Sequence, residues 1–268
     1  MKKNNLRISI LQQAIEGKLV PQLAADGNAQ DLVDNIREHK AELIREKKLK
    51  KDPNESYIYR DDEGHFMERI GKQEPVCIDE NLPFVVPEGW TWARLGEIVN
   101  MERGVTFPSS DKNYEPHDGL IPCLRTSNIQ ESVEYGDLLY IDESYIKGNT
   151  NKIVVPSDII LSSANSKELV GKTAFVDKVD KKITFGGFLM VLRSMGENPK
   201  FLFLLLRWLF YTNVLSKKSK QTTNIANLSS DILSSFLLPL PPLAEQARIV
   251  KKVEELLEEL DEMEKAVG

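Results

Sequence analysis

Residues 239–267 read PLPPLAEQARIVKKVEELLEELDEMEKAV, and this stretch shows how the chain is organised. Pro241 and Pro242 form a rigid junction suited to the start of a helix, because proline at the first helical position gives up no hydrogen bond. Apolar side chains then recur at alternating spacings of four and three residues. This repeat is typical of a helix that pairs with another helix along an apolar seam. The seam residues are Ile249, Val253, Leu256, Leu260 and Met263.

The seam covers fewer than three heptads, which is too short for a coiled coil that is stable alone. This helix therefore needs a partner helix. The pattern at about residues 5–16, with Leu6, Ile10 and Ala14 at helical spacing, is the candidate within the chain. Another chain, or sequence downstream of the given residues, is the alternative. Since an exposed apolar stripe marks an interface, we predict that the seam is a helix-pairing surface, within the chain or in a homodimer.

Two elements are predicted between the first helix and the central region. A second helix is expected from about residue 29 to residue 49, with an apolar stripe on one side and charged residues on the other. Alternating residues at Tyr57–Arg60 and His65–Arg69, separated by a turn sequence, predict a small β-hairpin. Residues 71–83 are polar and contain proline, which is typical of a linker.

The central region, from residue 84 to residue 238, has the pattern of an α+β domain. Short apolar stretches separated by turn signals predict strands. They are Trp92–Val99, Ile121–Leu124, Ile159–Ser163, Thr173–Val176, Ile183–Leu192 and a closing strand at Phe236–Leu238. One helix from Pro199 to about Leu215 is apolar on all sides and is therefore expected to be buried. The predicted fold is a globular α+β domain of short strands and helices, flanked by helices that form a coiled-coil-like spacer.

Composition excludes several classes of protein. The 268 residues are 41% hydrophobic and 28% charged, as in ordinary globular proteins. A membrane span needs ~20 apolar residues, and the longest apolar stretch, 201–211, is interrupted by Arg207; we expect a cytoplasmic protein without membrane contact. Two cysteines are too few for a disulfide framework or a zinc site. The net charge of −6 argues weakly against nucleic acid, yet residues 84–238 carry equal numbers of acidic and basic side chains.

The usual catalytic motifs are absent from the sequence. It contains no phosphate-binding glycine loop, no nucleophile elbow and no Asn-Pro-Pro-aromatic motif of amino-methyltransferases. The three histidines are far apart and lack metal-ligand spacing. Asp158, Asp180 and Lys182 loosely match the acidic–acidic–lysine pattern of magnesium-dependent nucleases. Two ordinary turns explain this pattern more simply, so a catalytic, metal-binding role is not predicted.

Polar loops at the ends of the predicted strands and of the buried helix are the best candidates for a site. They combine hydroxyls, amides and cations, which bond to phosphates and to base edges in the major groove of DNA. Ordinary surface turns have similar compositions, so composition alone does not decide between the two readings. We predict that lysines contact phosphates, that Arg103 and Arg125 suit guanine, and that Asn165 suits adenine. The candidate DNA-binding residues are Arg103, Lys112, Arg125, Thr126, Asn128, Ser163, Asn165, Lys167, Lys217, Lys218, Lys220, Thr222 and Asn224.

Four stretches together resemble the DNA-specificity (S) subunits of type I restriction–modification systems. They are residues 6–22, residues 87–98, residues 184–188 with 191–193, and residues 238–250. The resemblance extends over nearly the whole chain. It implies an N-terminal conserved helical region at 1–50, a hairpin and linker at 51–83, a target-recognition domain at 84–238 and a conserved spacer helix at 239–268.

The resemblance implies a recognition subunit that is not itself an enzyme. Such a subunit binds double-stranded DNA and reads one half of a split target. Modification subunits then methylate adenine with S-adenosylmethionine, and restriction subunits use ATP and magnesium, so no cofactor is expected in this chain. Members of the family have two recognition domains, whereas this sequence has one and no internal repeat; a fragment and a natural half-subunit both remain open. The alternatives are a self-contained magnesium-dependent endonuclease and a helix-mediated interaction protein.

Overall fold

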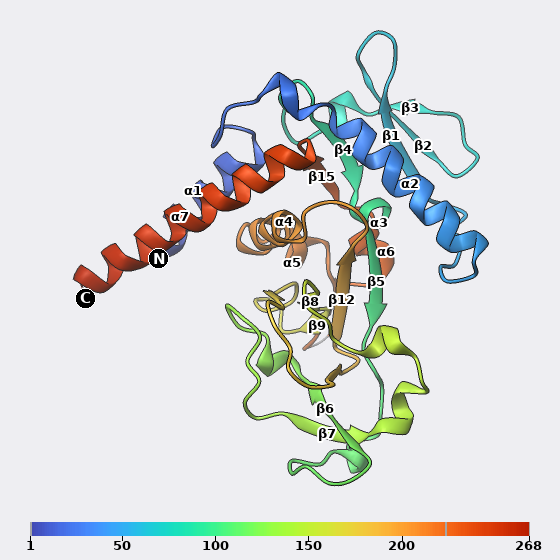
Figure 1. Ribbon diagram of the computed structural model, residues 1–268, viewed down its shortest axis with the longest axis vertical. Coiled ribbons are helices and arrows are strands. Elements are labelled where there is room, and N and C mark those ends of the chain that lie inside the picture. The colour runs from blue at the N-terminus through green and yellow to red at the C-terminus, as the bar shows by residue number, and fades with distance from the viewer. Residues whose placement is uncertain (1, 223, 268) are drawn as a thin grey trace. The chain divides into compact units, whose positions relative to one another are not determined.

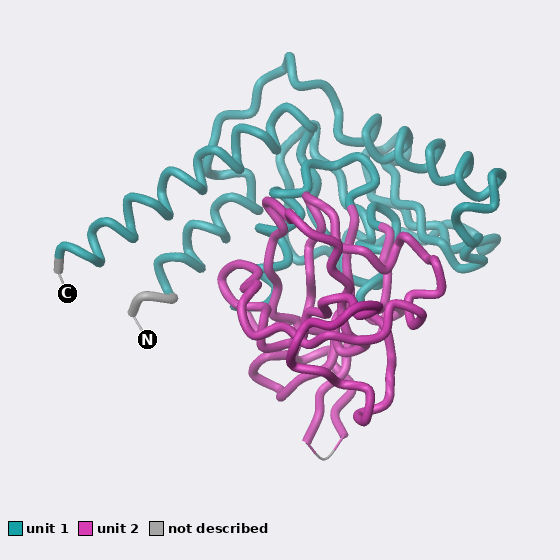
Figure 2. Tube along the Cα trace, turned by 60° about the horizontal axis from the view of Figure 1, so that its bottom comes forward, with its two compact units in different colours: residues 1–99, 194–211, 233–268 teal, residues 100–193, 212–232 magenta. Residues whose placement is uncertain are grey.

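The computed structural model describes residues 2–222 and 224–267, and it contains both helices and strands, which confirms the α+β class (Figure 1). The chain divides into two compact units (Figure 2). Unit 1 comprises residues 1–99, 194–211 and 233–268, and unit 2 comprises residues 100–193 and 212–232. The chain therefore passes between the units at four points rather than once.

Helices dominate unit 1. Its long helices are α1 (Lys2–Ile15), α2 (Ala29–Arg45), α4 (Pro199–Tyr211) and α7 (Leu243–Val267). Helix α7 packs against both α1 and α4, and α1 and α7 run side by side in opposite directions in Figure 1. Arg7 on α1 forms ion pairs with Asp261 and Glu264 near the end of α7. The predicted partner helix within the chain thus lies beside the seam.

The start of α7 is tied to residues from the first third of the chain. Arg248 forms an ion pair with Asp26, with 2.6 Å between the charged atoms. The Glu245 carboxylate accepts hydrogen bonds from the Trp90 indole and from Gln22, each at 3.0 Å. Unit 1 is therefore held together by contacts between segments that are far apart in the sequence.

The seam residues differ in how far they are covered. Ile249 and Val253 are fully buried, Leu256 is half-buried, Leu260 is 7% exposed and Met263 is 57% exposed. The seam is therefore covered along most of α7 and open near its end.

Changing Leu260 to aspartate is expected to destabilise unit 1 by about 3 kcal/mol or more, because it removes a buried leucine and buries a charge. Leu243→Asp, at a residue of the same helix that is 47% exposed, is the matched control, since an exposed change is expected to cost within about 0.5 kcal/mol. Chemical denaturation followed by circular dichroism measures both. Equal effects of the two changes would contradict packing of this seam within the chain.

The strands of unit 1 form two small sheets. The first has the order β1 (Ser56–Arg60), β2 (Phe66–Ile70), β3 (Val76–Cys77), and it confirms the predicted hairpin. In the second, β4 (Thr91–Arg94) pairs antiparallel with β15 (Leu237–Leu240). The predicted strand at 92–99 is therefore shorter than expected. The chain turns into the short helix α3 (Leu95–Ile98). In this helix Gly96 lies so close to Ser234 that a Cβ atom on the glycine would be 2.6 Å from the serine Cβ.

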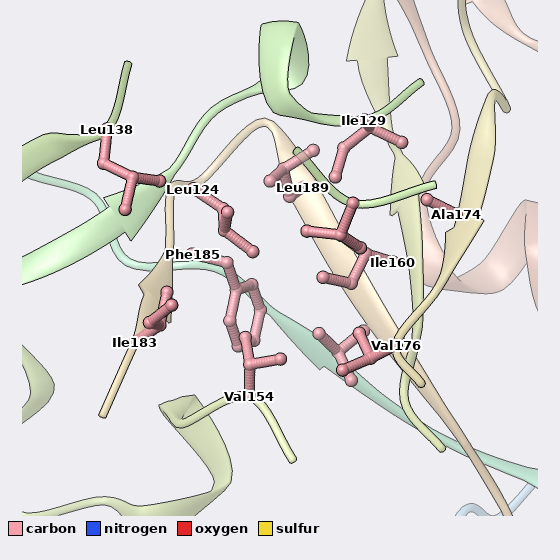
Figure 3. Packing of buried hydrophobic residues seen from close by; sticks show 12 residues of the cluster. Leu124, Ile129, Leu138, Val154, Ile160, Ala174, Val176, Ile183, Phe185 and Leu189 are labelled. Carbon is pink, nitrogen blue, oxygen red and sulfur yellow. The ribbon is translucent and has the colours of Figure 1, made fainter. Parts of the chain in front are cut away.

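Unit 2 is built mainly from short strands in three sheets. Their orders are β10-β8-β12-β5, β11-β6-β7 and β13-β14-β9. The strands are β5 (Val99–Arg103), β6 (Leu120–Leu124), β7 (Leu139–Asp142), β8 (Ile159–Ser162), β9 (Ala164–Asn165), β10 (Thr173–Phe175), β11 (Thr184–Phe185), β12 (Leu189–Ser194), β13 (Lys220–Gln221) and β14 (Ala226–Asn227). Phe185, Ile160 and Leu124 lie in one buried cluster that joins the first two sheets (Figure 3).

Short helical segments connect these elements. The remaining α-helices are α5 (Val214–Lys218) and α6 (Ser230–Ser234). The 3-10 helices are η1 (Ala24–Asp26), η2 (Asp79–Asn81), η3 (Ser109–Asp111), η4 (Thr126–Asn128), η5 (Glu143–Ile146) and η6 (Thr150–Lys152). In the part of the chain that the structure describes, no helix combines the length and the apolar character needed to cross a membrane.

Further predicted boundaries also differ from the structure. The predicted strand at 183–192 is two strands, β11 and β12, separated by residues 186–188. The predicted helix at 199–215 ends with α4, because Asn213 adopts a left-handed conformation with φ of 59° before α5 begins. The recognition domain at 84–238 stays a prediction; unit 2 divides the chain differently, since β4, α4 and β15 belong to unit 1.

Candidate nucleic-acid interface

A hollow of about 520 Å³ in unit 2 brings together four of the predicted DNA-binding residues. Arg103, Lys112, Arg125 and Thr126 come from three separate parts of the sequence and all line this hollow. The other lining residues are largely apolar and include Phe107, Leu124, Leu139 and Phe188. Cationic side chains around an apolar hollow can bind phosphates at its edge and contact bases inside it.

Hydrogen bonds fix the two arginines in different ways. Arg103 ends β5, is exposed, and donates from Nε to the Gly187 carbonyl at 3.4 Å. Arg125 follows β6 and donates from Nη2 to the backbone oxygen and the carboxylate of Asp137, at 2.7 and 2.6 Å. Its Nε atom is buried and, within the described ranges 2–222 and 224–267, has no hydrogen-bond partner. Arg103 is therefore the freer of the two guanidinium groups, whereas Arg125 is oriented by its own protein.

The inner wall of the hollow includes Cys123, which is chemically inert. Its thiol is completely buried, and burial raises the pKa of Cys123 to about 12. The residue therefore stays a neutral thiol and acts as a small apolar group. This wall of the hollow is suited to apolar contact rather than to nucleophilic chemistry.

A second group of predicted residues lies around a protruding hairpin. Strands β13 and β14 form a hairpin whose second strand pairs with β9, so Lys220, Thr222 and Asn165 belong to one small sheet region. The hairpin stands out from the rest of unit 2 in Figure 2. The exposed residues of this group are Lys167, Lys217, Lys218, Lys220, Thr222 and Asn224. Asn165 is half-buried, and its amide donates to Ser162 Oγ and accepts from the Ser166 amide.

Two predicted DNA-binding residues need correction. Asn128 is 3% exposed; its oxygen accepts from the Arg125 amide, and its amide donates to the Glu134 and Gly136 carbonyls. Ser163 is buried, and its hydroxyl donates to the Phe188 carbonyl at 3.0 Å. Both side chains therefore stabilise loops, because buried polar groups use their hydrogen bonds within the protein. The remaining candidate residues stay predictions.

Sequence reasoning missed Phe188, which lines the hollow with an exposed ring. An apolar residue inside a predicted strand, as Phe188 is in the one at 183–192, is normally assigned to the core, so its residue type gave no signal. The Gly186-Gly187 pair before it was the available hint, because two glycines inside a strand pattern indicate close backbone approach.

Two of the three residues of the nuclease pattern have structural partners instead. Asp158 is completely buried and forms a two-point ion pair with Arg193, at 2.7 and 3.0 Å. Lys182 forms an ion pair with Glu143. Among the described residues, no group of three or more His, Cys, Asp or Glu side chains could hold a metal ion. The endonuclease alternative is therefore not favoured.

Comparison with known proteins identifies the family. A family model described as the type I restriction modification DNA specificity domain matches residues 87–267, which is about two thirds of the chain. The chain belongs to this DNA-specificity family. The matched segment contains both the cation-lined hollow and the protruding hairpin of unit 2.

Individual members of this DNA-specificity family are similar over nearly the whole chain. The EcoAI specificity subunit of Escherichia coli is 31% identical over 255 residues, covering 94% of this chain and 39% of that protein. The EcoEI specificity subunit of Escherichia coli is 27% identical over 268 residues, covering 96% and 41%. The chain thus spans about two fifths of the length of these relatives.

A solved structure supports the same fold. The crystal structure of the HsdS subunit from Thermoanaerobacter tengcongensis is similar to this chain with a TM-score of 0.50 and 23% sequence identity. The similarity covers 69% of this chain and 42% of that chain. The likeness concerns the arrangement of the backbone, and the roles of individual residues follow from the geometry described above.

Proposed function

We propose that this chain recognises one half of a split DNA target as part of a type I restriction–modification complex and does not itself catalyse a reaction. The observation that supports this function best is the gathering of Arg103, Lys112, Arg125 and Thr126 around one hollow, within the segment matched by the DNA-specificity model. Cations placed around a hollow suit the phosphate backbone, and the arginines suit guanine edges.

The proposed complex assigns all chemistry to partner subunits. Modification subunits would bind the helices at residues 5–50 and 243–267, and partly unit 2, and would methylate adenine with S-adenosylmethionine. Restriction subunits would use ATP and magnesium. The chain itself would need no cofactor, and its work on cellular DNA would take place in the cytoplasm.

A second copy of the chain would recognise the other half of the split DNA target. This finer proposal is supported by the apolar residues left open on the paired helices, Leu6 at 49% exposed and Met263 at 57%. Two identical DNA-recognition units related by a two-fold axis require a DNA target with the same symmetry. The proposed dimer therefore predicts a symmetric split site.

The test is sequencing of DNA methylated by the chain reconstituted with a modification subunit. Methylation at one defined, split and symmetric motif is the expected result. An asymmetric motif would contradict the dimer, and methylation without sequence preference would contradict the recognition role. Cleavage of DNA by the purified chain with magnesium alone would contradict the non-catalytic assignment.

Lysines near the hairpin are expected to contribute to affinity without contributing to sequence preference. The double change Lys217→Ala and Lys220→Ala should weaken binding to all duplexes and reduce the slope of log K against log salt by about two, because each phosphate contact contributes ~0.9. Titrations at several salt concentrations measure this slope. Lys178→Ala with Lys181→Ala, two exposed lysines in another turn of unit 2, is the matched control. An unchanged affinity at low salt would show that the hairpin region does not face DNA.

A further inference from the structure

Phe188 is an aromatic residue of unit 2 whose side chain is exposed to solvent. It is 59% exposed, although Phe185 and Leu189 on either side of it in the sequence are completely buried. A single exposed apolar side chain needs no explanation by itself. The inference therefore rests on how the backbone holds Phe188 and on what surrounds its ring.

The backbone around Phe188 is held rigidly. Its carbonyl accepts hydrogen bonds from the Ser163 amide at 2.9 Å, the Ser163 hydroxyl at 3.0 Å and the Ala164 amide at 3.2 Å. The preceding turn is closed by a hydrogen bond from the Leu189 amide to the Gly186 carbonyl at 2.8 Å. Three donors on one carbonyl fix the position from which the ring projects. A backbone held in this way loses little conformational freedom when the ring contacts a ligand.

Glycines allow the backbone on either side of this turn to pack closely. A Cβ atom on Gly104 would lie 2.0 Å from the Gly186 carbonyl oxygen, and one on Gly187 would lie 2.9 Å from Thr106 Oγ1. The segment at residues 104–106 and the segment at residues 186–187 therefore approach each other more closely than residues with side chains would allow. This close approach fixes the wall of the hollow from which Phe188 projects.

The surroundings of the ring are cationic. Phe188 lines the same hollow as Arg103, Lys112 and Arg125, and the Arg103 guanidinium donates to the carbonyl of Gly187, the residue next to Phe188. Positive side chains of this kind bring the polyanionic backbone of DNA to the hollow. An apolar ring among them then needs an apolar group on the nucleic acid.

We propose that Phe188 is a specificity-determining residue that contacts the C5-methyl group of a thymine in the DNA target. Among the groups that base pairs present in the major groove, this methyl is the apolar one, and phenylalanine is among the side chains that contact it. Arg103 would then contact the neighbouring phosphate or guanine. This inference rests on the proposed DNA-recognition function.

The experiment begins with selection of bound duplexes from a random-sequence library by the full-length chain. The selected duplex is then remade with deoxyuridine in place of thymidine at one position at a time, which removes only the methyl group. The wild-type chain should lose about fourfold in affinity at one position, which corresponds to the ~0.8 kcal/mol of one buried methyl-sized group.

Three variants assign this loss to Phe188. Phe188→Ala should bind the thymine and uracil duplexes equally, whereas Phe188→Leu should keep part of the preference because it retains an apolar side chain. Val155→Ala, which shortens another exposed apolar residue of unit 2, should keep the full fourfold preference. Because the Phe188 ring lies mostly in solvent, these changes leave the packed core intact.

Several outcomes would overturn the inference. They are a selected target without thymine, a uracil scan without any loss, or a Phe188→Ala variant that keeps the preference. The same scan is repeated with duplexes that carry the fluorescent base 2-aminopurine. A scan without any loss of affinity, together with increased fluorescence, would indicate a side chain that intercalates between bases, and this result would also overturn the inference. If the wild-type chain selects no sequence at all, the proposed function fails as well; if it selects a sequence but the scan is flat, only the thymine contact is wrong.

Discussion

Replacing Arg193 with alanine is expected to destabilise unit 2 by about 3–5 kcal/mol, because the change leaves the Asp158 carboxylate buried without its partner charge. Asp158 is completely buried, and the guanidinium donates to both of its oxygens. Arg193 also donates to the carbonyls of Asn151 and Ile153. One side chain thus joins β12 to the loop that precedes β8.

Hydrogen exchange of the unit 2 strands, together with chemical denaturation, measures this loss. Lys182→Ala is the matched control, because its ion pair with Glu143 is half exposed on both sides and should contribute less than about 1 kcal/mol. Similar effects of the two changes would show that the Asp158 pair is not structural. That result would reopen the question of what the buried carboxylate does.

Substituting Glu97 with glutamine is expected to stabilise the protein at neutral and alkaline pH. Glu97 is buried in unit 1, and neither carboxylate oxygen has a hydrogen-bond partner among the residues that the structure describes. Burial raises the pKa of Glu97 to about 8, against the opposing effects of Arg37 and Lys40. The folded state therefore holds this proton more tightly than the unfolded chain does. It follows that the folded state gains stability at low pH and loses it as pH rises from about 4.5 to about 8.

The expected difference between Glu97→Gln and the wild type is near zero at pH 4.5. It grows by up to about 1.4 kcal/mol for each pH unit and levels off above pH 8. Burial also raises the pKa of Glu197 to about 7, so Glu197→Gln should show a smaller effect of the same sign. Denaturation curves at several pH values measure both effects. Glu88→Gln, at an exposed position of unit 1, is the control, and a difference for Glu97→Gln that does not vary with pH would contradict the prediction.

Several residues of the candidate nucleic-acid interface can be predicted because the sequence shows which side chains are cationic or can form hydrogen bonds. Arg103, Lys112, Arg125 and Thr126 were predicted from residue type and from position after strands, and the structure places them around one hollow. Burial could not be predicted in the same way. Asn128 and Ser163 are as suitable for DNA contact as for closing a turn, and only the folded loop shows that their hydrogen bonds are used internally.

Long-range pairing explains the other differences. Trp92 on β4 pairs with Pro239 on β15, and no local pattern indicates that these two segments meet. The sequence therefore predicted one continuous domain at 84–238, whereas β4 and β15 join unit 1. Phe188 was missed for a related reason, since its residue type indicates core and only the folded turn leaves its ring exposed.

The order in which segments complete each unit has a consequence for synthesis on the ribosome. All residues of unit 2 have been made once residue 232 is added, whereas unit 1 still lacks α7. At that point the contacts at the start of α7 have not formed, because Arg248, the partner of Asp26, and Glu245, the partner of Gln22 and Trp90, have not been made. The nascent chain thus completes unit 2 before unit 1. Translation that stops just before α7 would leave unit 2 complete in sequence and would leave α1 and α4 without the helix that packs against them.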